Sequence, residues 1–308
     1  MILSSFAAIL LSCFTTPSFL RYPFDNPTVP TTSYQFQLQT PAQGLSSLLA
    51  NHLSLIIQGN LTPETYAAIQ PTPSQRVSWR NVVTSLLNVA VDGGTSACLS
   101  IQETLPNALQ GIYTVMVVDN GKLCALVEVG TVRRGDNEEY GKGWGIFVVP
   151  TAKYGIGTTL HLAAPHPVFD LYTAGQTAHV FERTGAKSLY IPGRSRQAFL
   201  EETDCVTSTV KSKYWKTDPT HDKVGFTPCS PMVDLICLQG EMLFETYRAI
   251  LEWQSDPTGG GGCQDADTGS TSCAYIQFHG KGKRTCRKEQ VFLSAGLGTR
   301  FYSQPYPS

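Results

Sequence analysis

The chain has 308 residues, of which 23 are Lys or Arg and 24 are Asp or Glu, so its formal net charge is −1. This length is enough for one large hydrophobic core or two smaller ones. Because neither sign of charge forms a long run, the composition gives no support for binding to nucleic acid or to an anionic membrane, and we expect neither partner. It predicts no particular oligomeric state.

The N-terminus carries an apolar stretch, from about Phe6 to Phe14, followed by Thr16-Pro17-Ser18. The stretch is short for a membrane span and typical of a secretory signal peptide, although the usual basic residues before it are absent. We therefore predict that residues 1–20 are a signal peptide and that the protein is secreted to the extracellular space. A membrane anchor and a plain N-terminal helix are the alternatives.

Secretion would make disulfides the expected state of the cysteines. Without Cys13, which would leave with the signal peptide, eight of the 9 cysteines remain, an even number. Pairing cannot be deduced from the sequence, but Cys263 and Cys273 flank a Gly-rich loop and are the local pair that we expect. The sequence contains no C-x-x-C pair, so a zinc cluster held by cysteines is not expected.

The N-terminal third, residues 21–110, is predicted to contain an extended arm and two helices. The arm, about residues 20–45, is rich in Pro, Thr, Ser and Gln. The helices are expected near residues 44–57 and 79–91, because apolar residues recur there at helical spacing. We expect their apolar faces to pack against the catalytic core, and a groove for a partner is the alternative.

From Tyr113 onward the pattern changes to strands. Residues 113–118 and 122–129 flank Asp119-Asn120-Gly121, which predicts a hairpin. The further expected elements are strands at 144–149, 159–164, 188–192, 274–278 and 291–294, and helices at 174–184 and 241–254. Residues 111–308 are thus predicted to form one α/β domain, a three-layer α/β/α structure around a mixed sheet.

The segment 161–196 places a histidine and an aspartate where a strand ends. Pro165 and Pro167 stop the strand 159–164, so His166 and Asp170 fall on the loop beyond its C-terminal end. Open α/β sheets usually bind their ligands at this edge. Residues 173–176 read T-x-x-Q, which predicts a capping box for the following helix, and a glycine at 185 predicts its end.

A second histidine, His279, directly follows the strand 274–278 and is expected at the same edge. Two imidazoles and one carboxylate are a suitable donor set for zinc, so we predict one zinc ion held by His166, Asp170 and His279. The alternatives are that His166 and Asp170 only order their loop, and that His279 is a hydrogen-bonded core residue.

Further residues are candidates for substrate binding and catalysis. Arg196, at the end of the strand 188–192, could bind a substrate carboxylate or form a surface salt bridge. His221, on an Asp-Pro-Thr-His loop, could complete the site or lie on a solvated turn. Glu128, Glu138 and Glu139 are candidate general bases, and Glu139 is the one we include in the predicted site, although no spacing singles it out.

Six motifs, taken in order, resemble a poorly characterised group of secreted microbial proteins. More distantly, they are similar to zinc-dependent amidohydrolases of the carboxypeptidase-like and poly-γ-glutamate-hydrolase kind. The resemblance covers about residues 110–300. The motifs are Gly143-Trp144-Gly145, His166-Pro167-Val168-Phe169-Asp170 with Thr173, Gly193–Arg196, Asp218-Pro219-Thr220-His221, Gln277-Phe278-His279-Gly280 and Leu293-Ser294-Ala295-Gly296.

This resemblance implies an α/β/α hydrolase with one zinc, with His166, Asp170 and His279 as ligands and with Arg196 near a substrate carboxylate. Zinc would polarise the scissile carbonyl and lower the pKa of its bound water toward about 7. The sequence has His-x-x-x-Asp where the carboxypeptidase pattern has His-x-x-Glu.

The predicted function is therefore a secreted, zinc-dependent hydrolysis of an amide or peptide bond in a small peptide-like substrate. One alternative is a non-catalytic binding or structural protein on a hydrolase-like fold. Another is a metal-dependent phosphoesterase.

Residues 224–239, VGFTPCSPMVDLICLQ, interrupt this pattern with an apolar stretch that has neither helical nor strand periodicity. The segment begins and ends as a translated intron could, and an ordinary family-specific loop is the alternative.

Overall fold

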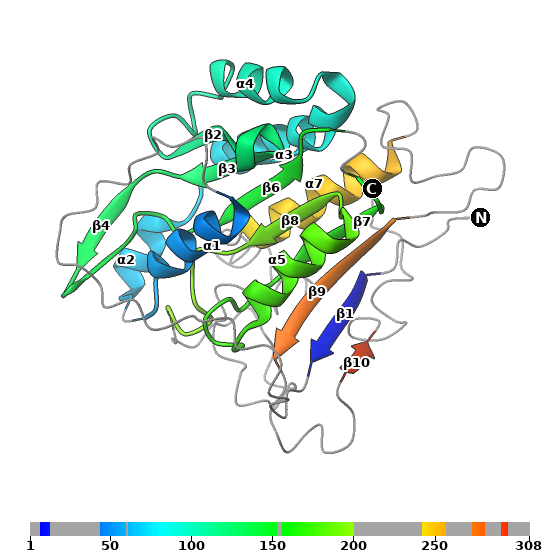
Figure 1. The fold of residues 1–308 in the computed structure, drawn as a ribbon. Coiled ribbons are helices and arrows are strands. Elements are labelled where there is room, and N and C mark those ends of the chain that lie inside the picture. Colours follow the sequence, from blue (N-terminus) through cyan, green and yellow to red (C-terminus); the bar gives the residue numbers. More distant parts are fainter. Residues whose placement is uncertain are drawn as a thin grey trace.

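A mixed β-sheet forms the centre of the protein (Figure 1). The computed structural model describes residues 7–12, 44–59, 61–152, 156–199, 242–256, 273–280 and 291–294. Across the sheet the strands are β10 (Val291–Ser294), β1 (Ala7–Ser12), β9 (Ala274–Gly280), β7 (Leu160–Ala163), β8 (Ser188–Ile191), β6 (Ile146–Pro150), β3 (Leu123–Glu128) and β2 (Tyr113–Val118). The pairs among β1, β9, β7 and β8 are parallel, and the remaining pairs are antiparallel.

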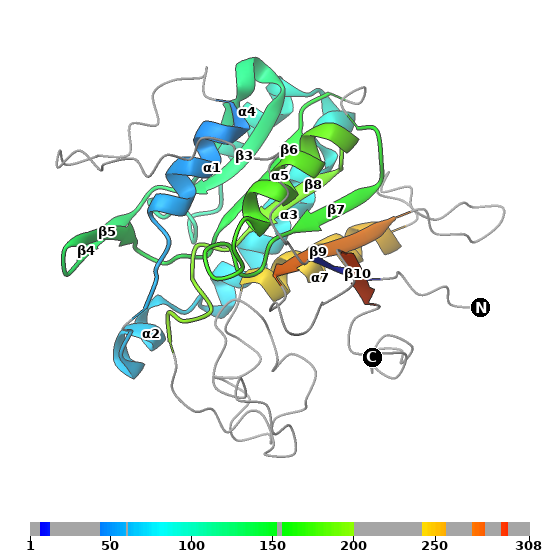
Figure 2. The same cartoon turned by 60° about the horizontal axis from the view of Figure 1, so that its bottom comes forward.

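Helices cover both faces of this sheet (Figure 2). One face is covered by α3 (Pro73–Asp92), α4 (Thr95–Glu103) and α7 (Met242–Ser255), and the other by α1 (Leu45–Ser54) and α5 (Thr173–Thr184). The predicted three-layer α/β/α class with a mixed sheet is confirmed. The N-terminal helices α1, α3 and α4 are part of these layers, so they belong to the same domain as the strands.

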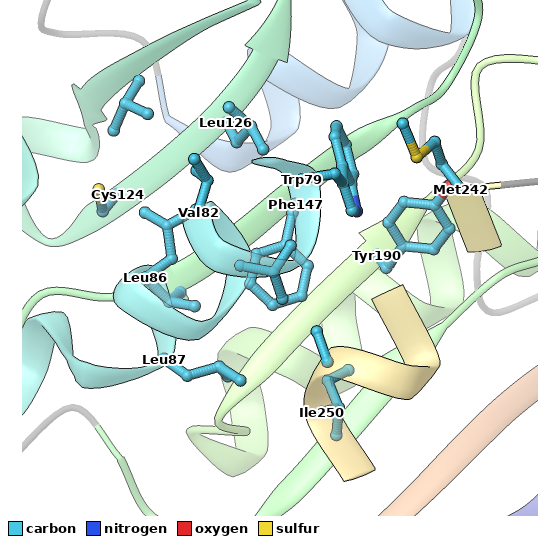
Figure 3. Close-up of a cluster of buried hydrophobic side chains, with 14 of the residues drawn as sticks. Trp79, Val82, Leu86, Leu87, Cys124, Leu126, Phe147, Tyr190, Met242 and Ile250 are labelled. Atoms are coloured by element: carbon cyan, nitrogen blue, oxygen red, sulfur yellow. The ribbon is translucent and has the colours of Figure 1, made fainter. Parts of the chain in front are cut away.

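The larger core lies between the sheet and α3 and α7 (Figure 3). Trp79 and Leu86 of α3 point toward Phe147 of β6 and Tyr190 of β8 in that view, and all four side chains are almost fully buried. Every residue of β3, β6 and β8 is buried. Strands covered on both faces are expected to be apolar throughout, which explains why these segments read as continuous apolar runs.

Helix ends differ from the predictions where capping decides them. α3 begins at Pro73, six residues before the predicted start, because Thr72 and Gln75 form a capping box in front of it. The capping box predicted at residue 173 is wrong: Thr173 is already helical, and its hydroxyl donates to the carbonyl of Asp170 at 2.8 Å. The predicted helix end at Gly185 is confirmed, with φ +59°.

The predicted hairpin is confirmed as β2 and β3, joined through a short 3₁₀ turn at Asp119–Gly121. The next strand, β6, starts at Ile146, two residues later than predicted. Gly145 has φ +104°, and a Cβ there would lie 2.5 Å from the carbonyl oxygen of Ile191. The close approach of two backbones therefore requires glycine at this position.

Besides β1, two short helices, α2 and α4, and one strand pair were not predicted. α2 (Pro63–Ile69) precedes α3, and β4 (Thr131–Arg134) pairs with β5 (Asn137–Tyr140) as a separate hairpin that lies away from β9 in Figure 1. The strands of this hairpin are largely polar, so they lack the apolar alternation that predicts a half-buried strand.

One disulfide links Cys98 of α4 to Cys124 of β3. Cys273 is also disulfide-bonded, and its partner lies outside the described residues. The predicted use of disulfides is confirmed, whereas the pairing of Cys263 with Cys273 stays a prediction because residue 263 is not described.

The predicted signal peptide, residues 1–20, contains one strand of the sheet. Residues 7–12 form β1, which pairs with β9 and β10, so cleavage after residue 20 would remove this strand from the sheet. Within the described ranges, no helix is both long enough and apolar enough to cross a membrane. The rest of the predicted signal peptide, the predicted arm before residue 44, His221 and the segment 224–239 lie outside the described residues.

Candidate metal centre

The site forms at the edge of the sheet where β7 and β9 end. The two strands are parallel, and the last residue of β7, Ala163, pairs with Gln277 of β9. His279 is therefore beyond the last paired residue of β7 and lies beside the loop that carries His166. This register explains why two histidines 113 residues apart in the sequence meet.

Three donor atoms from His166, Asp170 and His279 converge at this edge. The Nδ1 atom of His166 lies 3.0 Å from Oδ2 of Asp170, and Nδ1 of His279 lies 3.3 Å from Nδ1 of His166. The third separation, from Nδ1 of His279 to Oδ2 of Asp170, is 3.6 Å. A tetrahedral ion with bonds of about 2.0–2.1 Å separates neighbouring donors by about 3.3 Å. The three atoms thus have the spacing of one face of a metal tetrahedron, and the group could hold a metal ion.

The three side chains are buried, with 4%, 6% and 7% of their residue surface exposed for His166, Asp170 and His279. Burial by itself raises the pKa of the Asp170 carboxyl, but hydrogen bonds from His166 and His279 and from the Gly280 backbone outweigh it. The pKa of Asp170 is consequently held far below its usual range. A carboxylate that is ionised inside the protein is a suitable metal ligand.

Gln277 supports the group from the same strand. Its side-chain oxygen Oε1 lies 3.3 Å from Nε2 of His279 and accepts a hydrogen bond from it. In a metal-bound state this hydrogen bond would keep the proton on Nε2 and leave the lone pair of Nδ1 for the ion. Histidines that bind metals are commonly oriented in this way by a second hydrogen bond.

Gly280 allows β9 to approach the loop closely. A Cβ atom at this position would lie 3.0 to 3.1 Å from Cα, Cβ and Cγ of Asp170. Any other residue at position 280 would therefore have to displace Asp170 by a few tenths of an ångström.

Arg196 lies next to this group without belonging to it. It is half-buried, and its Cζ atom lies 4.8 Å from the ring centroid of Phe169, the residue before Asp170. The structure thus brings the predicted substrate-binding arginine to the loop that carries two of the three predicted ligands.

The acidic residues considered as general bases make their contacts away from the metal-binding group. Glu139, in β5, forms an ion pair with Arg134 at 3.4 Å and accepts a hydrogen bond from the backbone of Gln58. Glu138 accepts a hydrogen bond from Thr131. Neither side chain joins the group of His166, Asp170 and His279.

Glu128 has a clear structural role. It is buried and accepts backbone hydrogen bonds from Lys142, Gly143 and Trp144. Burial raises the pKa of Glu128 to about 7, against the opposing effect of these donors and of Arg194. Glu128 thereby holds the Gly-Trp-Gly segment next to the end of β8.

Sequence reasoning missed the two supporting residues, Gln277 and Gly280, and the buried histidine His52. Gln277 and Gly280 flank His279, so the Gln-x-His-Gly pattern was the available signal, but only the pairing of β9 with β7 shows what they contact. His52 of α1 is buried and lies between Tyr140 and Pro192. His161 is buried within β7 and hydrogen-bonded to Ser188 at 2.8 Å.

Comparison with known proteins found no match for this chain among family models, curated proteins or solved structures. The resemblance to zinc amidohydrolases stays a prediction, and the functional argument rests on the geometry of the described residues.

Proposed function

We propose that the protein is a secreted zinc-dependent hydrolase that cleaves an amide or peptide bond in a small substrate. The observation that supports this proposal is the buried triangle of donors from His166, Asp170 and His279, with sides of 3.0, 3.3 and 3.6 Å. Three protein ligands are typical of catalytic zinc sites, in which the fourth position is open to water or substrate.

Each residue has a distinct task in this proposal. His166, Asp170 and His279 hold the ion, and Gln277 fixes the ring of His279 through its Nε2 hydrogen bond. When bound, zinc supplies a Lewis acid for the scissile carbonyl and a water of lowered pKa. Arg196 would bind an anionic group of the substrate, since its guanidinium lies beside the same loop.

We propose that the general base is a residue outside the segment 128–139. Glu139 is already paired with Arg134, and Glu128 is used by backbone donors. His221 stays a prediction, because its loop lies outside the described residues.

The donor set has a second chemical interpretation. Two histidines and one carboxylate are also the ligands of non-haem Fe(II) oxygenases. The identity of the metal is therefore the first measurement, made by elemental analysis of the protein purified without chelator. We expect about one zinc per chain, and we expect His166→Ala and His279→Ala to lose it.

His179→Ala is the matched control, because His179 is exposed on α5. It should keep the zinc. Wild-type protein without any metal, or unchanged metal content in His166→Ala, would overturn the site, and stoichiometric iron would overturn the zinc hydrolase.

Turnover is then tested with peptides, γ-glutamyl amides and phosphate esters. Amide cleavage that is lost in His166→Ala and kept in His179→Ala supports the proposal. Cleavage of phosphate esters alone would identify a phosphoesterase, and bound zinc without any turnover would identify a non-catalytic protein.

Secretion is supported by the disulfide between Cys98 and Cys124, which is compatible with an oxidising compartment. Expression in the native host, followed by detection in the medium and determination of the N-terminal residue, tests secretion and the predicted cleavage together. Protein found only in the cell would contradict both.

A further inference from the structure

Three large apolar side chains are exposed on the loop between β7 and α5. Phe169, Leu171 and Tyr172 expose 37%, 71% and 71% of their residue surface. They are three of the six large hydrophobic residues that are exposed in the described part of the chain. Asp170, which lies between them in the sequence, is only 6% exposed, so the exposed apolar residues flank a proposed metal ligand along the chain.

Tyr172 is held in a backbone conformation that is unfavourable for tyrosine. Its φ is +67°, in the left-handed region, where a residue other than glycine costs about 1 kcal/mol. Hydrogen bonds hold this conformation: the Thr173 N–H donates to the Asp170 carbonyl at 3.2 Å, and the Gln176 N–H donates to the Tyr172 carbonyl at 2.9 Å.

The side chain of Tyr172 contributes little to the stability of the fold that would offset this strain. It precedes the first residue of α5 and makes no side-chain capping hydrogen bond, although Ser, Thr, Asp, Asn or Gly is preferred there. Glycine at this position would remove both the strain and the exposed apolar surface. A strained, exposed aromatic residue beside a metal-binding group is therefore expected to contact a ligand.

A positive charge accompanies the apolar side chains. The guanidinium of Arg196 lies over the ring of Phe169, with Cζ 4.8 Å from the centroid. The edge of the site thus combines apolar surface with one cation. A complementary ligand has an apolar group close to an anionic group, whereas a γ-glutamyl polymer offers carboxylates without the apolar group.

We propose that Phe169, Leu171 and Tyr172 form a subsite for an aromatic or branched aliphatic group of the substrate, next to an anionic group at Arg196. This inference rests on the proposed amide hydrolase and names its substrate class. Leu171 and Tyr172 determine specificity in this arrangement, and their side chains lose contact with water when the substrate binds.

Equilibrium binding tests the subsite without requiring turnover. N-acetylphenylalanine and N-acetylglycine share a carboxylate and an amide and differ in the apolar side chain. By calorimetry we expect the wild-type protein, as purified, to bind N-acetylphenylalanine about tenfold more tightly, which corresponds to partial burial of one aromatic group. Leu171→Ser and Tyr172→Gly should lose most of this preference, and Tyr172→Phe should keep it.

Two controls separate binding from folding. Leu99→Ser removes a leucine that is 51% exposed on α4, and it should leave the preference unchanged. Tyr172→Gly should unfold at the same temperature as the wild type or at a higher one, because it removes backbone strain. Weaker ligand binding in a variant that is at least as stable cannot be attributed to misfolding.

Equal affinity for the two ligands, or a preference that Tyr172→Gly and Leu171→Ser retain, would overturn the subsite even if the protein hydrolyses amides. Binding to phosphatidylcholine vesicles that these variants abolish, without a preference between the two ligands, would also overturn it and identify a lipid surface. A preference that depends on Tyr172 in a protein without hydrolase activity would support the subsite and refute the proposed reaction.

Discussion

His52 is expected to make the stability of the protein dependent on pH between about 6.5 and 4. The side chain is 1% exposed. Its Nδ1 lies 2.9 Å from the hydroxyl of Tyr140, and its Nε2 lies 3.0 Å from the carbonyl oxygen of Pro192, to which it donates. Burial lowers the pKa of His52 from 6.5 to about 4, and the backbone carbonyls only partly oppose this effect.

The sign and size of the effect follow from this shift. Because the pKa is lower in the folded state, the unfolded chain binds the proton first, and stability falls as the pH decreases. The contribution of His52 is complete above pH 6.5 and is lost progressively as the pH falls through about 4. For a shift of this size, the free energy of unfolding decreases by about 1.4 kcal/mol at pH 5.5 and by about 2.6 kcal/mol at pH 4.5, relative to pH 8.

Urea denaturation of the wild type and of His52→Gln at these three pH values measures the contribution. Glutamine can donate to Pro192 and accept from Tyr140 but does not titrate. Other buried groups, such as His161, whose pKa burial lowers to about 3, affect both proteins equally and cancel in the difference. The wild-type advantage should shrink by the amounts given above. Curves that stay parallel within about 0.5 kcal/mol from pH 8 to 4.5 would refute the reasoning.

Two further predictions concern the disulfide and the metal group. Replacing Cys98 and Cys124 together with Ala should lower the free energy of unfolding by about 3.5 kcal/mol, because the bridge closes a 26-residue separation; a loss below about 1 kcal/mol in urea denaturation would contradict this. Gly280→Ala should weaken zinc binding by about tenfold or more in a chelator competition assay, because the new Cβ displaces Asp170. Gly175→Ala, whose Cβ would meet nothing within 4 Å, is its control, and equal affinities of the two variants would contradict the prediction.

Much of the layer architecture could be predicted because local patterns agree with the tertiary structure. The turn at residues 119–121 lies between two apolar strands, and the observed pairing follows that signal. The glycine at 185 ends α5 with a positive φ, as expected. Where the local signal was ambiguous, as in the two Thr-x-x-Gln sequences, only the first proved to be a capping box. The second is prevented because the Thr173 hydroxyl donates to a carbonyl in the metal-binding loop.

The three donors of the candidate centre could be predicted because parallel strands end at a common edge. The residues that support these donors could not be predicted, because their contacts depend on the register between strands. The contact of Gly280 with Asp170 and the position of Gln277 follow from the pairing of β9 with β7. Glu139 was chosen without a distinguishing spacing, and the structure pairs it with Arg134 in a hairpin whose polar strands gave no signal.

The pairing of β9 with β7 also has a consequence for the order of folding. β2, β3, β6, β7 and β8 lie within a contiguous stretch of the chain, whereas β9 follows β8 only after α7. Contacts between distant segments form slowly, because the intervening chain must be ordered first. During synthesis the donors on the loop after β7 would emerge long before His279, so metal binding becomes possible only when β9 docks. The ion would then be captured at one of the last steps of folding, and its uptake rate would report the completion of the sheet.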